Sequence, residues 1–328
     1  LPGRRALAEQ FGVTPHLIRK AINLLADRGA VRIRPREGVQ VVQRGPGQAG
    51  IRSIVAIHDN DTSLFTQEVL LGVDRQSTRR RLTMEVKPEP AELAGPDCLE
   101  RLAGADPLTI GWVFIDVIPP ESSLLAWRVD GMSVVQVDDY SPTGLGNVVA
   151  FDVERAVFQA TDHLIGLGHR RIAFIGRIPL PDSQVGAGRE RGFELALGHH
   201  GLSLDDCPTL PMGQTGETVE RTRQLLRQDD RPTAIVTANQ RSGCEVIAAA
   251  DAMGIEVPRQ LSVVSAGVHT RASLPQLQRL SCFDAGAPEQ LGELAVEVVA
   301  DAADNPDPRR VLIDCEWVDR GSSAPPLA

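Results

Sequence analysis

Aromatic residues make up only 4% of the 328 residues, and no run of apolar residues approaches the length of a membrane-spanning helix. The five cysteines lie far apart without a Cys-x-x-Cys pair, which excludes a zinc knuckle and a disulfide framework. The sequence opens on Leu-Pro-Gly-Arg-Arg, not on a charged and then apolar secretion signal. We therefore expect a cytoplasmic protein whose cysteines are small core residues.

Charge is distributed unevenly along the chain. Residues 1–50 contain nine Lys and Arg residues against three Asp and Glu residues, a balance of +6, and the remaining residues have a balance of −15. A small basic segment on a large acidic one is typical of a nucleic-acid-binding module joined to a domain that does not bind polyanions. With 42% hydrophobic residues, the chain is long enough for two or three globular domains.

The basic segment has the pattern of two short helices and a hairpin. Gly12 ends the first helix, and Thr14 before Pro15 is typical of the start of the second. The predicted elements are helices over residues 4–11 and 15–27 and strands over residues 31–34 and 39–42. Their buried faces are predicted to contain Ala6, Leu7, Phe11, Leu17, Ile18, Ala21, Leu24 and Leu25.

The second helix carries a polar face opposite its apolar one. Its side chains recur at helical spacing, with long cations that suit phosphates and His or Asn side chains that suit base edges. This face fits the major groove of DNA. With the first helix and the hairpin tip included, the candidate DNA-binding residues are Arg4, Thr14, His16, Arg19, Lys20, Asn23, Arg34 and Arg36.

Three runs of residues in this segment carry a family resemblance. Residues 1–13, the run Ile18-Arg19-Lys20-Ala21 and the tip Arg34-Pro35-Arg36-Glu37-Gly38 resemble the winged helix-turn-helix head of GntR-type transcription regulators. The resemblance implies that residues 1–44 form a DNA-binding domain. Two features depart from the family: its first helix is missing before Leu1, and Thr14-Pro15-His16 replaces the Ser-Arg that usually opens its recognition helix.

Residues 45–50 are rich in Gly and Pro and are interpreted as a linker. They include a Gly-x-Gly-x-x-Gly pattern at Gly45, Gly47 and Gly50. This pattern binds dinucleotides only between a strand and a helix start, and the residues that follow it are themselves strand-like. We interpret it as accidental, and we expect no cofactor.

Residues 51–328 alternate short β-rich runs with helical stretches, which favours an α/β fold with parallel sheets covered by helices. This length is too great for one sheet of typical width, so we expect two subdomains with a cleft between them. The predicted subdomains are residues 51–150 with 283–308 and residues 151–282 with 309–328.

Five runs in this region, in order, resemble the effector domain of lactose/galactose-repressor (LacI/GalR) proteins. They are residues 164–176, 189–193, 232–239, 254–264 and 320–323. The resemblance implies a periplasmic-binding-protein-like fold, with an effector in the cleft and dimerisation through this body. The chain is therefore similar to hybrid repressors that join a GntR-like head to such a body.

No arrangement typical of an enzyme is found. Ser265 lacks the first glycine of a Gly-x-Ser-x-Gly elbow, and there is no phosphate-binding loop. Asp138 and Asp139 are neighbours on a predicted strand end and should face opposite ways, so they are not expected to converge on a metal. His169, at a helix end, is expected to cap carbonyl groups rather than bind a metal.

Effector contacts are expected at strand ends and loops. The candidates are Phe65, Arg189, Asn239, Gly267 and His269. Arg189 should start a helix and point into the cleft, Asn239 follows a strand, and core packing is an equal alternative for Phe65. The remaining strand-end acids, Asp59, Asp61 and Asp138, are expected to be solvated loop carboxylates.

Gly267 occupies the place where sugar-responsive relatives carry an acid after this strand. A buried Arg189 without a facing carboxylate would favour an anionic effector, such as a sugar phosphate or acid. Two alternatives stay open: the cleft binds nothing tightly, or His269 or one of Asp59, Asp61 and Asp138 takes the place of the missing carboxylate. The sequence as a whole predicts a transcription regulator that is homodimeric, binds an operator and acts as a repressor. A sugar or sugar derivative is expected to control it. The alternatives are a solute-binding receptor without DNA function and a sugar-converting enzyme, for which no acid/base pair or phosphate-binding loop is found.

Overall fold

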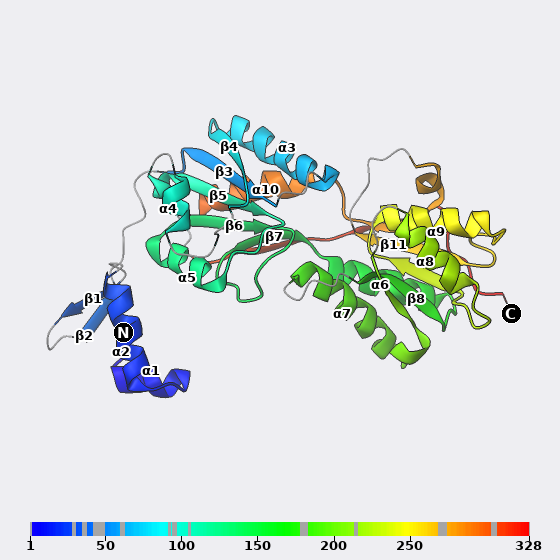
Figure 1. Cartoon of the computed structure of the whole chain (residues 1–328), viewed down its shortest axis with the longest axis horizontal. Helices are drawn as coiled ribbons and strands as arrows, with labels where there is room; N and C mark the ends of the chain where they lie inside the picture. Colours follow the sequence, from blue (N-terminus) through cyan, green and yellow to red (C-terminus); the bar gives the residue numbers. More distant parts are fainter. Residues whose placement is uncertain are drawn as a thin grey trace.

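The computed structural model describes residues 2–27, 31–34, 38–41, 50–59, 63–90, 93, 97–103, 106–177, 183–212, 216–267, 274–302 and 307–327. It contains a small head and a two-subdomain α/β body, each subdomain built on a six-stranded, mostly parallel sheet (Figure 1). The predicted α/β fold is therefore confirmed. None of the described helices is long and apolar enough to cross a membrane.

The head consists of helices α1 (Arg4–Phe11) and α2 (Pro15–Asp27) and an antiparallel hairpin of β1 (Val31–Arg34) and β2 (Gly38–Val41). Gly12 ends α1 with a left-handed φ of 63°, as the sequence predicts. The Thr14 hydroxyl accepts a hydrogen bond from the Leu17 backbone N–H (3.3 Å), so the predicted helix cap is confirmed.

The first subdomain has the strand order β13-β7-β6-β5-β3-β4, with every pairing parallel. Helices α3 and α10 cover one face of the sheet, and α4 and α5 cover the other (Figure 1). The elements are β3 (Ser53–His58), α3 (Leu64–Arg79), β4 (Thr83–Pro88), α4 (Cys98–Leu102), β5 (Ile110–Ile115), α5 (Glu121–Asp130), β6 (Ser133–Val137), β7 (Asn147–Phe151), α10 (Glu289–Asp301) and β13 (Arg310–Ile313).

The second subdomain has the strand order β14-β12-β11-β10-β8-β9, parallel except for the pairing of β12 with β14. Helices α6 and α7 cover one face of this sheet, and α8 and α9 cover the other. The elements are α6 (Val153–Gly166), β8 (Ile172–Arg177), α7 (Gln184–His199), β9 (Thr209–Pro211), α8 (Glu217–Leu226), β10 (Ala234–Thr237), α9 (Gln240–Ala252), β11 (Ser262–Gly267), β12 (Ser281–Asp284) and β14 (Glu316–Val318).

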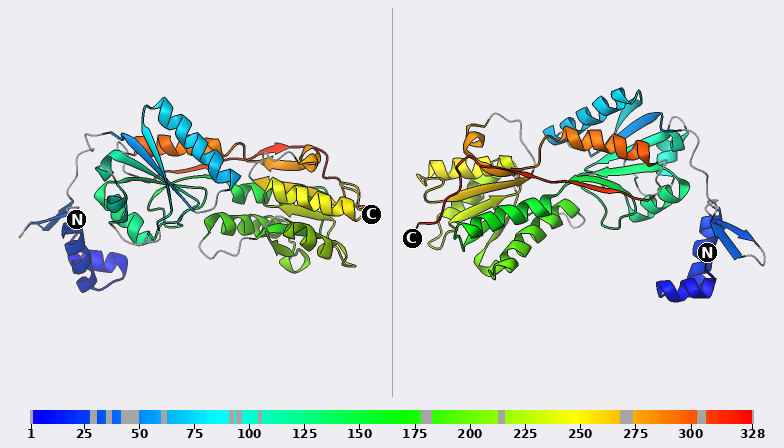
Figure 2. Two further views of the ribbon diagram at one scale, coloured as in Figure 1. Left: turned by 45° about the horizontal axis from the view of Figure 1, so that its top comes forward. Right: turned by 180° about the vertical axis from the view of Figure 1, so that it is seen from behind.

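The chain crosses between the subdomains three times, after β7, after β12 and after β13. Two predicted boundaries are therefore wrong: β12, assigned in part to the first subdomain, pairs with β11, and β13, assigned to the second, pairs with β7. Figure 2 shows β13 and β14 as one extended run along both subdomains. The periodicity of a short strand gives no information about which sheet it joins, because either edge can accept it.

Helix α7 differs from the sequence prediction at its start. It begins at Gln184 and not at Arg189, because Ser183 caps it and Gly188 and Gly192 lie against α6.

Glycines set how closely two helix pairs approach. A Cβ atom at Gly72 of α3 would lie 1.9 Å from the Glu289 carbonyl oxygen, and one at Gly292 of α10 would lie 2.1 Å from the Val69 carbonyl oxygen. In the second subdomain, a Cβ at Gly192 of α7 would lie 2.2 Å from the Glu154 carbonyl oxygen of α6. The backbones of both helix pairs are therefore in direct contact.

His169 fixes the C-terminal segment to the second sheet. Its imidazole is 1% exposed and contacts the Thr233 hydroxyl (2.8 Å), the Ser262 hydroxyl (3.1 Å) and the Ala324 carbonyl (2.9 Å). The predicted capping of the preceding helix is wrong, because Arg170 donates to the Ile165 carbonyl instead (3.1 Å). Burial lowers the pKa of His169, so its neutral form is favoured.

Candidate functional site

The outward face of α2 brings the predicted DNA-binding side chains together. His16, Arg19, Lys20 and Asn23 are all exposed, and the Arg19 guanidinium lies 3.4 Å from the His16 Nδ1 atom. The opposite face packs Ile18 and Ile22 against Ala8, Val31 and Val39. This packing holds α2 against the hairpin and turns its cations away from the head's core.

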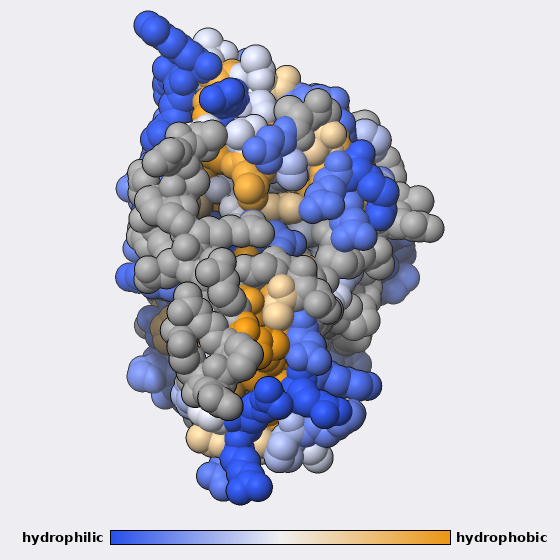
Figure 3. Space-filling model, turned by 90° about the vertical axis from the view of Figure 1, so that its left-hand side faces the viewer, coloured by the Kyte–Doolittle hydropathy of each residue, from blue (hydrophilic) through white to orange (hydrophobic). Residues whose placement is uncertain are grey.

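The predicted head core is wrong at four residues. Phe11 and Leu17 are 64% and 51% exposed, and Ala6 and Ala21 are also exposed. Ile18 is buried as predicted, together with Ile22, which the prediction omitted, since residues four apart lie on one helix face. Figure 3, which views the molecule from the head's side of Figure 1, shows hydrophilic residues around the periphery with hydrophobic areas between them.

The other candidate DNA contacts are only partly described. Arg4 is exposed at the start of α1, and the Thr14 side chain is engaged as the cap of α2. Arg34 belongs to β1, but its side chain lies outside the description, as does Arg36 altogether. The role of these four residues at DNA stays a prediction.

In the body, acidic residues follow three neighbouring strands of the first sheet. Asp59 follows β3, Asp116 follows β5 and Asp138 follows β6, and these strands are adjacent in the order β6-β5-β3. The carboxyl ends of parallel strands meet at one edge of a sheet, which is where α/β proteins bind ligands. Asp116 is not among the predicted site residues, although Asp116 follows a buried strand just as Asp138 does.

Asp138 is 9% exposed, and the expectation of a solvated loop carboxylate is wrong. Its φ is 65°, and that of Asp116 is 54°, so both residues leave the extended backbone of their strands. Strand alternation therefore does not apply at Asp138 and Asp139, and the charges of both carboxylates act on the Arg189 guanidinium. The expectation that the two acids do not converge on a metal stays a prediction.

Helix α7 brings the second subdomain to this edge. The Asp139 Oδ1 atom accepts hydrogen bonds from the backbone N–H groups of Gln184 (2.8 Å) and Val185 (3.3 Å), and Val185 packs into the core of the first subdomain. Arg189, one turn further along α7, is 5% exposed. A carboxylate at a helix N-terminus is stabilised by the unpaired N–H groups and the helix dipole.

The acids and Arg189 form one electrostatic cluster. Burial raises the pKa of Asp138 to about 6, although Arg189 acts to lower it. Burial, and then the charges of Asp138, Asp59 and Asp139, raise the pKa of Asp116 well above its ordinary value. Burial lowers the pKa of Arg189, while the nearby carboxylates act to raise it. The side chains of Asp116 and Asp138 also interact, which raises the pKa of Asp116 and lowers that of Asp138, so a proton shared by the two is favoured on Asp116.

Three of the remaining effector candidates have structural roles in the body. The Asn239 side chain caps α9 by accepting from the Ser242 N–H (2.8 Å). Phe65 is partly buried against the core of the first subdomain. Gly267 has a φ of 104°, and a Cβ there would lie 2.9 Å from the Ala238 carbonyl oxygen, so no acid could stand in its place. His269 and Asp61 lie outside the described residues, and effector contact by the five candidates stays a prediction.

Within the described part of the chain, no group of three or more His, Cys, Asp or Glu residues could hold a metal ion.

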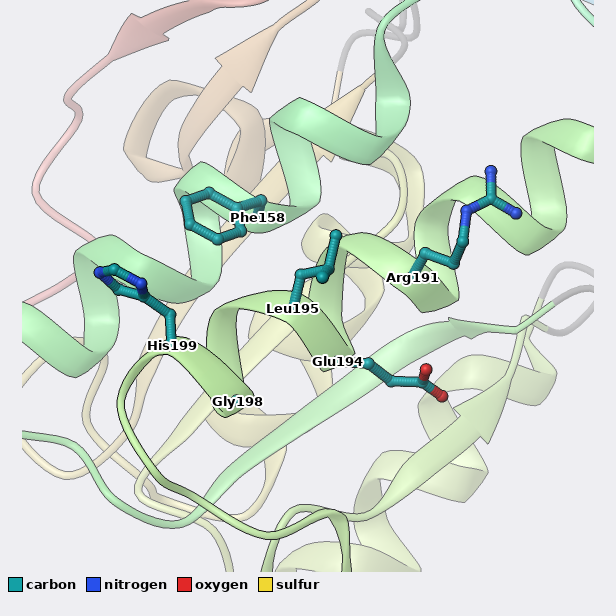
Figure 4. Close-up of a pocket in the computed structure, with 6 residues that line it drawn as sticks. All are labelled: Phe158, Arg191, Glu194, Leu195, Gly198 and His199. Carbon is teal, nitrogen blue, oxygen red and sulfur yellow. The ribbon is translucent and has the colours of Figure 1, made fainter.

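A groove lies between α6 and α7 in the second subdomain. It is lined by Phe158, Arg191, Glu194, Leu195, Gly198 and His199 (Figure 4). Its lining is mainly apolar, and Arg191 is paired with Glu154 (3.0 Å). The groove therefore offers no converging polar groups.

Comparisons with known families match both parts of the chain. Residues 1–41 match the model of bacterial regulatory proteins of the gntR family, and residues 161–323 match that of the periplasmic binding protein-like domain. Catabolite control protein A of Priestia megaterium is 32% identical over 146 residues, which cover 42% of this chain and 43% of that protein. The chain thus matches less than half the length of that relative.

Solved structures show the same fold. A LacI transcriptional regulator from a Rhodococcus species superposes with a TM-score of 0.65 at 23% identity, over 83% of this chain and 98% of that one. The lac repressor dimer bound to operator and the anti-inducer ONPF gives a TM-score of 0.70 at 16% identity, over 84% of this chain and 94% of that one. At these identities the likeness shows the fold alone.

Proposed function

We propose that this chain, which joins a gntR-family head to a periplasmic binding protein-like body with the fold of LacI regulators, is a cytoplasmic transcription regulator. Its head binds a DNA operator, and a small molecule bound in the body controls that binding. The observation that carries the proposal is the exposed face of His16, Arg19, Lys20 and Asn23 on α2, in a segment that matches the gntR family. We propose repression as the mode of action, because the curated relatives include repressors.

The proposed regulator is a homodimer. One helix in the major groove reads only a few base pairs, and a two-fold protein matches a palindromic operator. The lac repressor structure with the same body fold is a dimer bound to its operator. The body of this chain is the proposed dimerisation domain.

The proposed effector is a sugar or sugar derivative held between the subdomains, where Asp138, Asp139 and Arg189 converge. The expectation of an anionic derivative rested on a buried Arg189 without a facing carboxylate. That premise is wrong, because the charges of Asp138, Asp139 and Asp116 all act on Arg189. An added negative charge would be repelled by these acids, so the proposal no longer includes an anionic effector.

The DNA-binding proposal is tested by mixing the full chain with genomic DNA fragments and sequencing those that it retains. We expect a few recurrent sequences with two-fold symmetry, and an affinity that falls steeply with salt because Lys and Arg release counterions from phosphates. The double substitution of Arg19→Ala and Lys20→Ala should weaken binding at least tenfold, by about 1–3 kcal/mol.

A matched control removes two exposed cations of the body, Arg75→Ala with Arg227→Ala, and changes the net charge equally. We expect this control to bind the retained fragments like the wild type. Equal losses in the two double variants, or binding that is insensitive to salt, would contradict the assignment of the α2 face.

A further inference from the structure

The cluster at the carboxyl ends of β3, β5 and β6 has an excess of acids. Asp138 and Asp139 act electrostatically on Asp116, and Asp116 and Asp138 follow the adjacent strands β5 and β6. Among the residues that the structure describes, Arg189 is the single cation that acts on Asp138. With one proton on Asp116 or Asp138, these two acids and Asp139 carry more negative charge than Arg189 offsets.

Two polar atoms in this cluster are buried and have no hydrogen-bond partner. They are the Oδ1 atom of Asp138 and the Nε atom of Arg189, on side chains of residues that are 9% and 5% exposed. A buried polar atom without a partner costs about 1–3 kcal/mol, more when the group is charged. Asp138 belongs to the first subdomain and Arg189 to the second, and the charge of each group shifts the pKa of the other. The two atoms without partners therefore lie where the subdomains meet.

Three classes of ligand would meet this cluster differently. An anion would satisfy Arg189 but would add to the repulsion among the acids. A neutral polyol would donate hydrogen bonds and leave the excess charge in place. A protonated amine donates up to three hydrogen bonds and also offsets the negative charge, so it complements both features.

We propose that the ligand of this body carries a protonated amine, which binds to the paired carboxyl groups of Asp116 and Asp138. The inference rests on the proposed effector site and specifies its ligand class. Binding of the cation favours the ionised form of both acids and releases the proton that they share. A neutral or anionic ligand has no such effect, so proton release is the signature of the amine.

The experiment uses the full chain and a panel of small sugars and polyols in which each carbon skeleton is present as amine, alcohol and carboxylate. Thermal unfolding identifies the compounds that stabilise the protein. Calorimetric titration near pH 6, in buffers of different ionisation enthalpy, then counts the protons released. We expect amines to be the stabilising members of the panel and to release protons on binding.

Variants identify the acids responsible. Asp138→Asn should weaken amine binding by about thirtyfold or more, since it removes one partner of a buried charge pair. Asp116→Asn, which mimics the protonated carboxyl group, should reduce the proton release to the part that comes from Asp138, whose pKa is about 6. It serves as the second variant if Asp138→Asn does not fold. Asp74→Asn, an exposed acid of α3, is the matched control and should bind amines like the wild type.

The inference is overturned if alcohols or carboxylates stabilise the protein more than their amine counterparts, if no amine stabilises it, or if amines bind without releasing protons. DNA retention by the same preparation separates this outcome from failure of the proposed function. A protein that retains specific fragments while no amine binds is still a DNA-binding regulator, with a ligand of another class.

Discussion

Asp116 and Asp138 each end a buried strand with a left-handed backbone conformation. Left-handed φ values are uncommon for residues other than Gly, and Asp is among those that tolerate them best. Burial is the main cause that raises the pKa of both carboxyl groups in the folded protein. The interaction between the two side chains raises the pKa of Asp116 further and lowers that of Asp138.

Stability should depend on pH through this pair. The pKa of Asp138 is raised from 3.8 to about 6 on folding, so its contribution to stability is complete below the unfolded value and is lost as pH rises through the folded value. We expect the free energy of unfolding to decrease on the order of 1–3 kcal/mol between pH about 4 and about 7. Urea unfolding at a series of pH values measures this decrease.

Asp116→Asn should weaken that pH dependence, because the amide cannot ionise and the raised pKa of Asp116 no longer contributes, while burial and Asp139 still raise the pKa of Asp138. Asp74→Asn, at an exposed site, should leave the slope unchanged. A slope that is the same in the wild type and in Asp116→Asn would show that the pair does not share a proton.

The sequence predicts the site only in part, and the reason lies at single residues. That Asp59 and Asp138 follow buried strands is evident from the hydrophobic runs. The burial of Asp138 is not, because the strand order that places β3, β5 and β6 side by side is a tertiary property. The left-handed φ of Asp138 ends the alternation of its strand, and no periodicity reports it. Arg189 is buried as predicted, and Asp138, one of the acids named as its alternative partner, acts on its charge.

Helix contacts in the body depend on glycine to an extent that composition does not reveal. Gly72 and Gly292 lie where α3 crosses α10, and Gly192 lies where α7 crosses α6. Each position brings backbone against backbone, so a methyl group would have to separate two helices. Helical propensity alone would favour Ala at all three positions, and tertiary packing overrides it.

Gly72→Ala and Gly292→Ala should each destabilise the protein by about 1–3 kcal/mol, because the close approach of α3 and α10 must widen. Gly198→Ala is the matched control: it lies in a helix, and a Cβ there would meet nothing within 4 Å. The control should stabilise the protein by about 0.5–1 kcal/mol. Denaturant unfolding compares the three, and similar effects at all three sites would contradict the role of the crossing.

The segment after β14 behaves as a structural element although it forms no strand. His169 and Ser262 hold the Ala324 carbonyl at 2.9 Å each, in the interior of the second subdomain. The sequence predicts that His169 caps a helix, because it follows a helix end. Its actual partners lie 64 to 155 residues away along the chain.

His169→Ala should destabilise the protein by about 2–4 kcal/mol, since it removes the buried contacts of the imidazole with Thr233, Ser262 and Ala324 and leaves a cavity. The stability that His169 contributes should decline as pH falls below 6.5, the ordinary pKa of His, because burial lowers the pKa of His169 in the folded state, so the difference between the wild type and His169→Ala should become smaller. His169→Ala should lose less over the same range. Thermal unfolding at pH about 5 and about 8 tests both expectations.

At the scale of the whole molecule, the head and the body differ in charge and in fold. The head presents the cations of α2, and the body places its acids at the junction of its two sheets. The fold class and the division into head and body were predicted correctly, because helix signals, charge asymmetry and two family resemblances all agreed. The exchange of β12 and β13 between sheets was not, because short edge strands carry too little pattern.

The proposed dimer has a simple test at this scale. Light scattering of the full chain without DNA should give about twice the monomer mass of 35.4 kDa. The mass should be unchanged in the double variant of Arg19→Ala and Lys20→Ala, because the body is the proposed dimerisation domain. A monomer at micromolar concentration would contradict the proposal.

The three crossings between subdomains have a consequence for synthesis on the ribosome. The first sheet lacks its edge strand β13, and the second lacks β12 and β14, until residues 281–318 have been made. Neither subdomain can therefore complete its sheet before this segment has been made, although α6 to α9 emerge much earlier. The edges of β7 and β11 are unpaired over that interval, and we expect the nascent body to be prone to aggregation during it.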